Sequence, residues 1–347
     1  MEKQLAQELI EFIHKSPTSF HVVHNTQQEL TAQGFEELSL GNMWHIKKGG
    51  KYFVTQNQSS LFAFEIGSED ITQGIKFICA HSDSPTFRIK PTPEISVADK
   101  YLKLNIEVYG SPIMYTWFDR PLSLAGRVIL QGENPLKPIS RLIDFNRPLL
   151  IIPHIAIHFN RNVNTQGSAL SKQKDMIPVI SAIHGSLEKN NFLLNLIAKE
   201  LGVNTEEILD FDLTLYEYEK GCLLGANNEF ISCSKLDDLA MVYAGLKALL
   251  NSQPSTQTKV LAIFDNEEVG SRSKQGAGSP ILRTIIERIA IGLSGNPEDF
   301  YRCLHNSFMI SADMAHALHP NYVEKQDPTN HPVINGGPVI KYNANQK

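Results

Sequence analysis

The chain has 347 residues, of which 42% are hydrophobic and 20% charged, and its formal net charge is −5. These values are typical of a folded globular protein with one large or two ordinary domains. The mild negative charge and the lack of any basic run give no indication of nucleic-acid binding, so we expect no nucleic-acid partner. The N-terminal residues lack a signal-peptide apolar segment, and no apolar run is long enough to span a bilayer. The four cysteines show no C-x-x-C spacing, so we expect a cytoplasmic protein with reduced thiols and no membrane partner.

The first 66 residues combine helical periodicity with short apolar runs. These patterns predict two helices and three strands, at residues 2–15, 21–32, 44–47, 52–56 and 61–66. Gly34 is expected to end the second helix. Gly49-Gly50 is typical of a hairpin turn and would join the first two strands.

The next predicted strand, residues 75–80, leads directly into His81 and Asp83. Side chains two positions apart in an extended chain point to the same side. One ring nitrogen of His81 can then bind a metal while Asp83 fixes the tautomer through the other nitrogen. A polar turn closed by Ser84-Pro85 is the alternative interpretation.

Residues 91–222 have a different character from the segments on either side. Residues 101–108 alternate apolar and polar side chains, which predicts a strand with one wet face. The block is further expected to hold strands at 127–130, 149–158 and 212–217 and a helix at 192–201. We interpret it as a mostly β domain inserted into an α/β domain formed by residues 1–90 and 223–347.

Carboxylates also stand beside the later apolar segments. Asp237 precedes a buried helix, Glu267 and Glu268 follow a β-branched strand, and Asp313 follows another apolar strand. The elements concerned, with one further helix, are expected at residues 239–250, 259–263, 280–291 and 307–310. Each acid alone has an ordinary explanation, as a helix cap or a solvated turn residue.

Four separate segments with such residues are more informative than any one of them. Open α/β sheets place their chemistry at the carboxyl ends of strands, so these side chains are expected to converge. Mixed histidine and carboxylate ligands suit Zn²⁺, or Mn²⁺ and Co²⁺ where oxygen dominates. Two ions about 3.5–4 Å apart require a bridging carboxylate, and a nearby glutamate can serve as general base.

At these residues the sequence resembles the M18 family of metallopeptidases, the aspartyl aminopeptidases. The motifs are His-Ser-Asp-Ser-Pro at 81–85, Leu-Asp-Asp at 236–238, Phe-Asp-Asn-Glu-Glu-Val-Gly-Ser at 264–271 and Ser-Ala-Asp-Met-Ala-His at 311–316. Further matches extend from the first helix to the last residues. The resemblance implies a zinc-peptidase-like α/β/α catalytic domain, with the inserted β-rich block serving dimerisation.

The resemblance also implies roles for the acids and for His81. His81 and Asp313 would hold one metal, Glu268 would hold the other, and Asp237 would bridge them. Glu267 would be the base that takes a proton from water, and Asp83 would orient His81.

Four more residues match family positions near the substrate. His158 resembles a histidine that family members project into a neighbouring subunit's site, with a packed strand histidine as the alternative. Lys341 matches a lysine near an acidic substrate side chain, with a surface lysine as the alternative. His316 and His319 resemble motif histidines that support the site without binding metal.

The resemblance implies a metallo-aminopeptidase that removes N-terminal, preferably acidic, residues from short peptides. It also implies a dimer-based homo-oligomer, up to a dodecamer. Family chains normally continue beyond the equivalent of Lys347, and a late histidine there completes the second metal site. A chain without that segment could be a truncated, non-catalytic subunit that retains the fold. Two further alternatives are a peptidase of neutral specificity and a purely structural zinc site.

Overall fold

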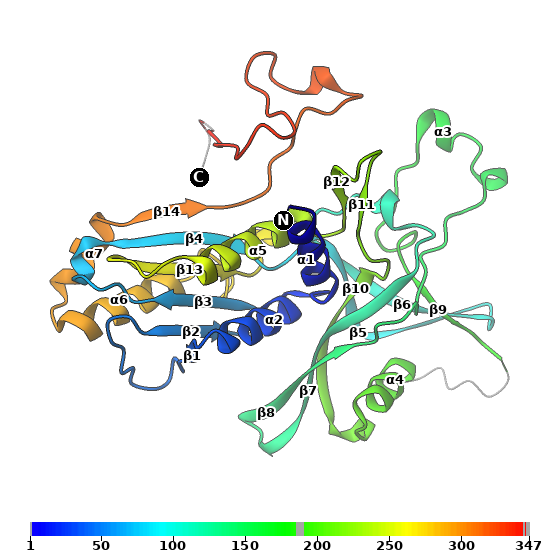
Figure 1. Ribbon diagram of the computed structural model, residues 1–347. Helices are drawn as coiled ribbons and strands as arrows, with labels where there is room; N and C mark the ends of the chain where they lie inside the picture. Colours follow the sequence, from blue (N-terminus) through cyan, green and yellow to red (C-terminus); the bar gives the residue numbers. More distant parts are fainter. Residues whose placement is uncertain (1, 185–190, 343, 345–347) are drawn as a thin grey trace.

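The computed structural model describes residues 2–184, 191–342 and 344. Within these residues the chain forms two six-stranded sheets and a two-stranded hairpin (Figure 1). The first sheet has the order β1 (Glu36–Glu37), β2 (Lys51–Gln56), β3 (Ser60–Glu65), β13 (Thr258–Phe264), β4 (Ile75–His81), β14 (Phe308–Ser311). The second has the order β8 (Lys137–Asp144), β7 (Leu122–Asn134), β10 (Ile208–Glu217), β5 (Thr86–Val97), β6 (Tyr101–Tyr109), β9 (Val179–Ala182). The hairpin is β11 (Cys222–Leu224) with β12 (Phe230–Ser232).

The first sheet is mixed, and the directions of its strands decide where its side chains meet. β13 runs antiparallel to β3 and parallel to β4, and β14 also runs parallel to β4. In register, Phe264 lies beside His81, and Ser311 lies beside Cys79. The carboxyl ends of β13, β4 and β14 therefore share one edge of the sheet.

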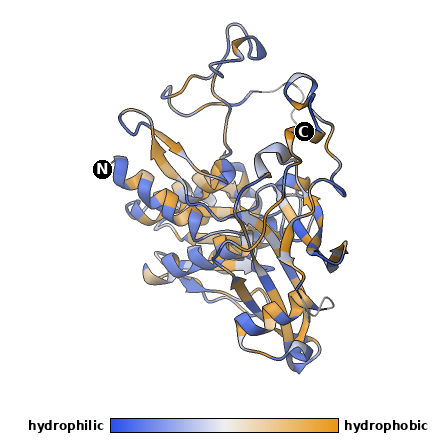
Figure 2. Ribbon diagram, turned by 90° about the vertical axis from the view of Figure 1, so that its right-hand side faces the viewer, coloured by the Kyte–Doolittle hydropathy of each residue, from blue (hydrophilic) through white to orange (hydrophobic). Residues whose placement is uncertain are grey.

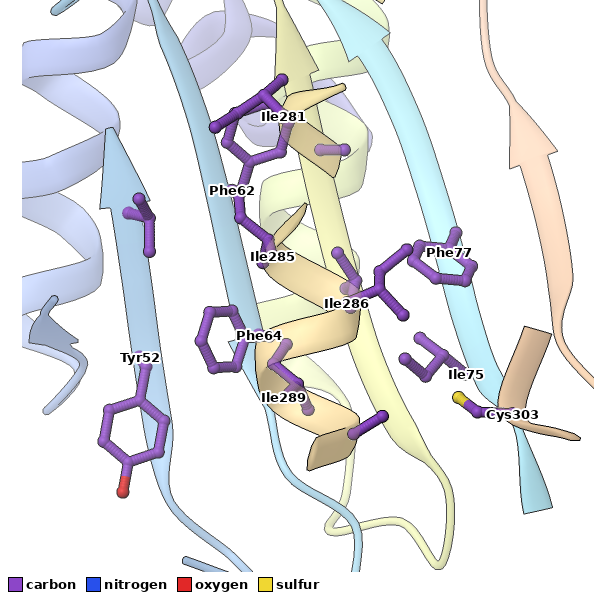
Figure 3. Packing of buried hydrophobic residues seen from close by; sticks show 14 of the residues in the cluster. Tyr52, Phe62, Phe64, Ile75, Phe77, Ile281, Ile285, Ile286, Ile289 and Cys303 are labelled. Carbon is purple, nitrogen blue, oxygen red and sulfur yellow. The ribbon is translucent and has the colours of Figure 1, made fainter. Parts of the chain in front are cut away.

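Helices cover both faces of the first sheet. One apolar cluster joins it to α1 (Glu2–His14), α2 (Ser19–Ala32) and α5 (Leu236–Asn251), and another joins it to α6 (Ile281–Ser294) and α7 (Glu298–His305). Alternate residues of β13 enter the two clusters, as a strand with two covered faces requires. Figure 3 shows the second cluster, in which isoleucines of α6 pack on Phe62, Phe64 and Phe77. This α/β/α layering confirms the expected fold class.

The second sheet is antiparallel, and a third apolar cluster lies on it. α4 (Phe192–Leu201) packs on this sheet through Leu193 and Ile197. The remaining short helices are α3 (Val163–Gln166), η1 (Ile71–Gln73), η2 (Met114–Trp117), η3 (Ile157–Phe159), η4 (Thr205–Glu207), η5 (Glu267–Val269) and η6 (Val323–Lys325). The strands of this sheet span Thr86 to Glu217, and the assignment of 91–222 to dimerisation stays a prediction.

Two predicted strands are wrong. Residues 44–47 form no strand; Trp44 and Ile46 instead pack on the α6 side of the core, which explains their alternating apolar pattern. The hairpin partner of β2 is β3, and the turn between them passes through Asn57 with a φ of 56°.

Residues 149–158 give isolated bridges in place of a continuous strand. Pro148 and Pro153 bracket the bridged residues and remove donors that a ladder requires. The sequence patterns also gave no indication of β8 or α7.

Figure 2 shows hydrophobic residues along the strands and hydrophilic ones on outward-facing parts of the helices. Beyond β14 the described chain is coil apart from η6, and it extends away from the sheets (Figure 1). Among the described residues we find no helix with the length and apolar character needed to cross a membrane.

Candidate metal centre

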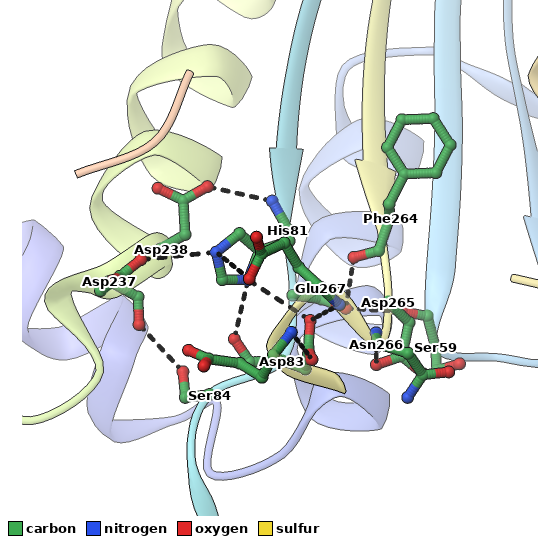
Figure 4. A network of polar contacts seen from close by, with 12 residues as sticks. Ser59, His81, Asp83, Ser84, Asp237, Asp238, Phe264, Asp265, Asn266 and Glu267 are labelled. Atoms are coloured by element: carbon green, nitrogen blue, oxygen red, sulfur yellow. Dashed lines mark hydrogen bonds and ion pairs between the residues drawn. The ribbon is translucent and has the colours of Figure 1, made fainter. Parts of the chain in front are cut away.

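The shared edge of β4, β13 and β14 brings together the acids and the histidine that the sequence singled out. His81 is the last residue of β4, and Glu267 begins η5, three residues after the end of β13. Asp313 follows β14, and Asp237 lies at the start of α5. Figure 4 shows His81 between the α5 aspartates and the loop that carries Glu267.

Two groups of potential ligand atoms share His81. In the first, atoms of His81, Asp237, Asp238 and Asp313 all lie within 4.8 Å of one another. In the second, atoms of His81, Glu267 and Glu268 do so. All four residues predicted to hold metal thus belong to these groups, with the predicted base Glu267 beside them.

The His81 ring is oriented with its two nitrogens facing different partners. Nε2 lies 3.4 Å from Asp237 Oδ1 and 3.9 Å from Glu267 Oε2. Nδ1 lies 3.0 Å from the Asp83 carbonyl oxygen and 3.3 Å from Asp83 Oδ1. Asp83 is therefore the hydrogen-bond partner of Nδ1, and Nε2 points at the carboxylates. This is the orientation that a metal-binding histidine requires.

Asp83 also holds the glutamate turn. Its Oδ1 accepts the Glu267 N–H and its Oδ2 the Glu268 N–H, each at 3.1 Å. Burial opposes ionisation of Asp83, but hydrogen bonds from His81, Tyr109 and this turn lower its pKa. An ionised Asp83 is thus built into the site.

The other carboxylates repel one another. Burial, followed by the charge of Asp313, raises the pKa of Asp237. Burial, together with neighbouring carboxylates, raises the pKa of Glu268 to about 7 and that of Asp238 to about 7, although His81 opposes both shifts. Burial alone would lower the pKa of His81, but Asp83, Asp238 and Glu267 outweigh it and raise this pKa to about 9.

This electrostatic strain is what a cation would relieve. In addition, Asp238 Oδ1 is buried and has no hydrogen-bond partner among the described residues. One histidine nitrogen with several carboxylate oxygens is a donor set that suits Zn²⁺. The residues present therefore fit a divalent cation at this edge of the sheet.

A cavity of about 790 Å³ opens beside the donor groups. Its lining includes Asp83, Asp237 and Glu268, and it extends to α2 through Phe20 and to the second sheet through Thr214 of β10. Its volume is sufficient for a small ligand or a short peptide segment. The donor groups are thus accessible to a substrate from between the two sheets.

Of the four residues predicted to lie near the substrate, two lie at the cavity or the donor groups and two do not. His316 lines the cavity. Lys341 lies beside the first donor group, where its Nζ donates to Asp313 Oδ2 and to the Met314 carbonyl, both at 2.7 Å. His319 accepts the Asn321 N–H within its own loop, and His158 is exposed on η3; neither is among the described residues that line the cavity.

Sequence reasoning missed two residues of the site. Asp238 accepts the main-chain N–H of His81 at Oδ2, at 3.0 Å, and its place in the Leu-Asp-Asp motif was an available signal. Tyr109 donates its hydroxyl to Asp83 Oδ2 at 2.7 Å. Nothing in the alternating pattern of residues 101–108 indicated that their strand reaches the donor groups.

An α/β/α sheet with histidine and carboxylates gathered at its carboxyl edge defines a metal-dependent hydrolase, and comparison with known proteins specifies which kind. Residues 12–347 match the family model described as aminopeptidase I zinc metalloprotease (M18). The chain therefore belongs to the M18 family of aminopeptidases, which confirms the resemblance drawn from the motifs.

Sequence similarity to curated relatives extends over the whole chain. A "Probable M18 family aminopeptidase 2" of Clostridium acetobutylicum is 54% identical over 347 residues, covering 100% of this chain and 80% of the relative. One of Pseudomonas savastanoi pv. phaseolicola is 41% identical over 351 residues, with coverage of 100% and 80%.

Solved structures show the same fold. The "Cryo-EM structure of the Ape4 and Nbr1 complex" matches with a TM-score of 0.94 and 36% identity, covering 99% of this chain and 70% of that one. The "Structure of S. cerevesiae mApe1 dodecamer" matches with a TM-score of 0.82 and 28% identity, covering 94% and 75%.

Proposed function

We propose that this M18 aminopeptidase uses two zinc ions and Glu267 to remove acidic N-terminal residues from short peptides. The observation that carries the proposal is the pair of ligand groups that share His81. His81, Asp237 and Asp313 would hold one ion, and Glu268 would hold the other with Asp237 between them. Zinc held in such a site acts as a Lewis acid that polarises a carbonyl group and lowers the pKa of water.

The residues around the donor groups have distinct tasks in this proposal. Glu267 takes the proton of the attacking water and delivers it to the leaving amine, which returns Glu267 to its ionised form. Its side chain is about half exposed, at 53%, so this carboxylate is accessible to solvent. Asp83 keeps His81 and the glutamate turn in place.

An acidic preference is supported by Lys341, whose ammonium lies at the rim of the first donor group. A substrate carboxylate can form a charge-assisted hydrogen bond with this ammonium. His316, which lines the cavity, and His319 would support the site from the same loop.

Self-association is supported by exposed apolar residues of the segment that carries His158. Ile155 is 54% exposed, Ile157 47% and Phe159 81%. An apolar patch of this kind is typical of an interaction surface. Because the matched structure of S. cerevesiae mApe1 is a dodecamer, we propose a homo-oligomer in which residues 91–222 make subunit contacts and His158 reaches a neighbouring site.

The test combines zinc content with peptidase specificity. We expect two tightly bound zinc ions per chain, loss of activity on chelation and recovery with zinc, and faster hydrolysis of Asp- and Glu-anilides than of the Leu-anilide. Glu267→Gln should lower kcat by about 10³-fold and leave zinc content unchanged. Glu298→Gln, an exposed acid of α7, is the matched control.

Each rival gives a different result. Fewer than two tightly bound ions per chain with no turnover would identify a non-catalytic subunit. Faster hydrolysis of the Leu-anilide than of the Asp- and Glu-anilides would contradict the proposed acidic specificity. Full activity of the Glu267→Gln variant would contradict the role of Glu267 as general base. Two tightly bound zinc ions without any turnover would indicate a purely structural zinc site.

A further inference from the structure

The end of β6 crosses from the second sheet to the donor groups of the first. Tyr109 is the last residue of β6, where it pairs with Thr86 at the start of the antiparallel strand β5. Its hydroxyl donates to Asp83 Oδ2 at 2.7 Å and accepts a hydrogen bond from Asn266 Nδ2 at 2.8 Å. A side chain of the β-rich sheet thus contacts the carboxylate that orients His81.

The hydroxyl completes the hydrogen bonding of a buried carboxylate. Asp83 is only 5% exposed. Its Oδ1 faces Glu267 N at 3.1 Å and His81 Nδ1 at 3.3 Å, and its Oδ2 faces Glu268 N at 3.1 Å. The Tyr109 hydroxyl supplies the second partner of Oδ2, so its removal leaves a buried charged oxygen under-satisfied.

Asn266 fixes the hydroxyl from the other side. Its side-chain oxygen accepts hydrogen bonds from Ser273 Oγ at 2.7 Å and Gln275 Nε2 at 2.8 Å. These bonds determine which end of the amide is the oxygen, so its NH₂ group faces Tyr109. Asn266 also has a left-handed φ of 64° immediately before Glu267, and the same network therefore sets the start of the glutamate turn.

The residue that follows β6, Gly110, lies close to a proposed metal ligand. Gly110 has a φ of +70°, and a Cβ there would lie 3.2 Å from Glu268 Cβ and 3.4 Å from Glu268 Oε2. The Cα of Pro85 would be 3.4 Å away on another side. Both the backbone conformation and the space favour glycine at this position.

We propose that Tyr109 is a positioning residue of the catalytic centre, acting on His81 and the Glu267–Glu268 turn through Asp83, with Gly110 leaving the space that Glu268 requires. The inference rests on the proposed function of these ligands. It implies that the site is complete only when the β-rich sheet is docked against the α/β layers. Outer partners of metal ligands typically alter metal affinity or activity by 10- to 100-fold when removed.

The test is Tyr109→Phe in the full chain, which removes the hydroxyl and keeps the ring. We expect zinc affinity of the metal-free protein, measured by competition with a chromogenic chelator, to fall about tenfold. The kcat should fall by a similar factor while KM stays within about twofold, because the substrate contacts remain.

Tyr243→Phe is the matched control. Tyr243 Oη donates to Glu8 Oε2 at 3.0 Å, on the side of α5 that faces α1, and Tyr243 is absent from the described lining of the cavity. This variant loses a tyrosine–carboxylate hydrogen bond of the same kind, and zinc affinity should stay at the wild-type value. Equal effects of the two variants on zinc affinity would mean that Tyr109 has only a structural role, which would overturn the inference.

Gly110→Ala provides a second, independent perturbation. The added methyl group should displace Glu268 and weaken zinc binding by about tenfold or more, with Tyr109 intact. Wild-type zinc affinity in both Tyr109→Phe and Gly110→Ala would also overturn the inference. A wild-type chain that binds no zinc and hydrolyses no peptide would instead refute the proposed function, so the two failures are distinguishable.

Discussion

Lys341 donates to Asp313 Oδ2 at 2.7 Å, and this ion pair stands at the rim of the donor groups. The two side chains are 48% and 44% exposed, and pairs this exposed contribute about 0–1 kcal/mol to folding. The pair therefore matters little for stability. Under the proposed function the pair matters for the substrate, because an acidic substrate side chain would compete with Asp313 for the ammonium of Lys341.

Lys341→Gln should reduce kcat/KM for Asp- and Glu-anilides by about 10- to 100-fold, since a charge-assisted hydrogen bond contributes about 1.5–3 kcal/mol. The Leu-anilide should be hydrolysed at nearly the wild-type rate, because it offers no charge to this lysine. Lys325→Gln, in η6 of the same loop, is the control. A parallel loss for all three substrates would argue against a role in specificity.

His158 and Glu267 should complement each other between subunits. His158→Ala and Glu267→Gln are each expected to lower activity strongly, because each would remove one part of the proposed site shared by two chains. When the two variants are dissociated and reassembled together, some sites should combine an intact His158 with an intact Glu267 and regain activity. His305→Ala, an exposed histidine of α7, should stay active throughout. Mixtures with no activity above the separate variants would place His158 outside the shared site.

His21 should make the folded state sensitive to acid. Burial lowers the pKa of His21 to about 4, and its Nδ1 lies 2.8 Å from Thr18 Oγ1. Between pH 6.5 and pH 4 the unfolded chain binds a proton that the folded chain excludes, so stability falls as the pH falls. From pH 7 to pH 5 this one group should cost about 2 kcal/mol.

Urea unfolding at pH 7 and pH 5 would measure the effect of His21. His21→Gln should make the pH dependence shallower by about that amount, whereas His24→Gln, an exposed neighbour on α2, should leave it unchanged. The same pH dependence in wild type and His21→Gln would show that this imidazole does not titrate differently on folding.

Gly245 sets the distance between α5 and the first sheet. A Cβ at this position would lie 2.8 Å from Leu261 Cδ1 and 3.2 Å from Ile78 Cγ2. Gly245→Val should therefore destabilise the fold by about 2 kcal/mol through overpacking. Gly292→Ala on α6 meets only Ile46, at 3.5 Å, and should instead stabilise by about 0.5–1 kcal/mol. Thermal melting of both variants would check the contrast, and equal shifts would contradict it.

The elements that the sequence predicts well here are a helix and two apolar strands whose residues are mostly buried. The predicted helix at 192–201 coincides with α4, and the apolar strands at 75–80 and 259–263 lie within β4 and β13. Their parallel pairing puts His81 and the glutamates at one edge, as the strand-end argument requires. The four distant segments that the whole proposal depended on do meet.

The sequence-based predictions fail where contacts between distant segments determine the local structure or the site. Trp44 and Ile46 alternate like strand residues, but they are anchored by side-chain packing, with the Trp44 ring 6.1 Å from that of Phe64. Tyr109 could not be recognised, because its contact with Asp83 depends on how two sheets dock. Local propensity contains no information about such docking.

The proposed ligands are spread along the chain from His81 to Asp313. Because synthesis proceeds from the N-terminus, a ribosome-bound chain lacks a full set of ligands until nearly all of the described residues have been made. Fragments released by premature termination before Asp313 would consequently be inert as hydrolases. The order of the proposed ligands along the gene would thus delay peptidase activity until the strands of both sheets have been synthesised.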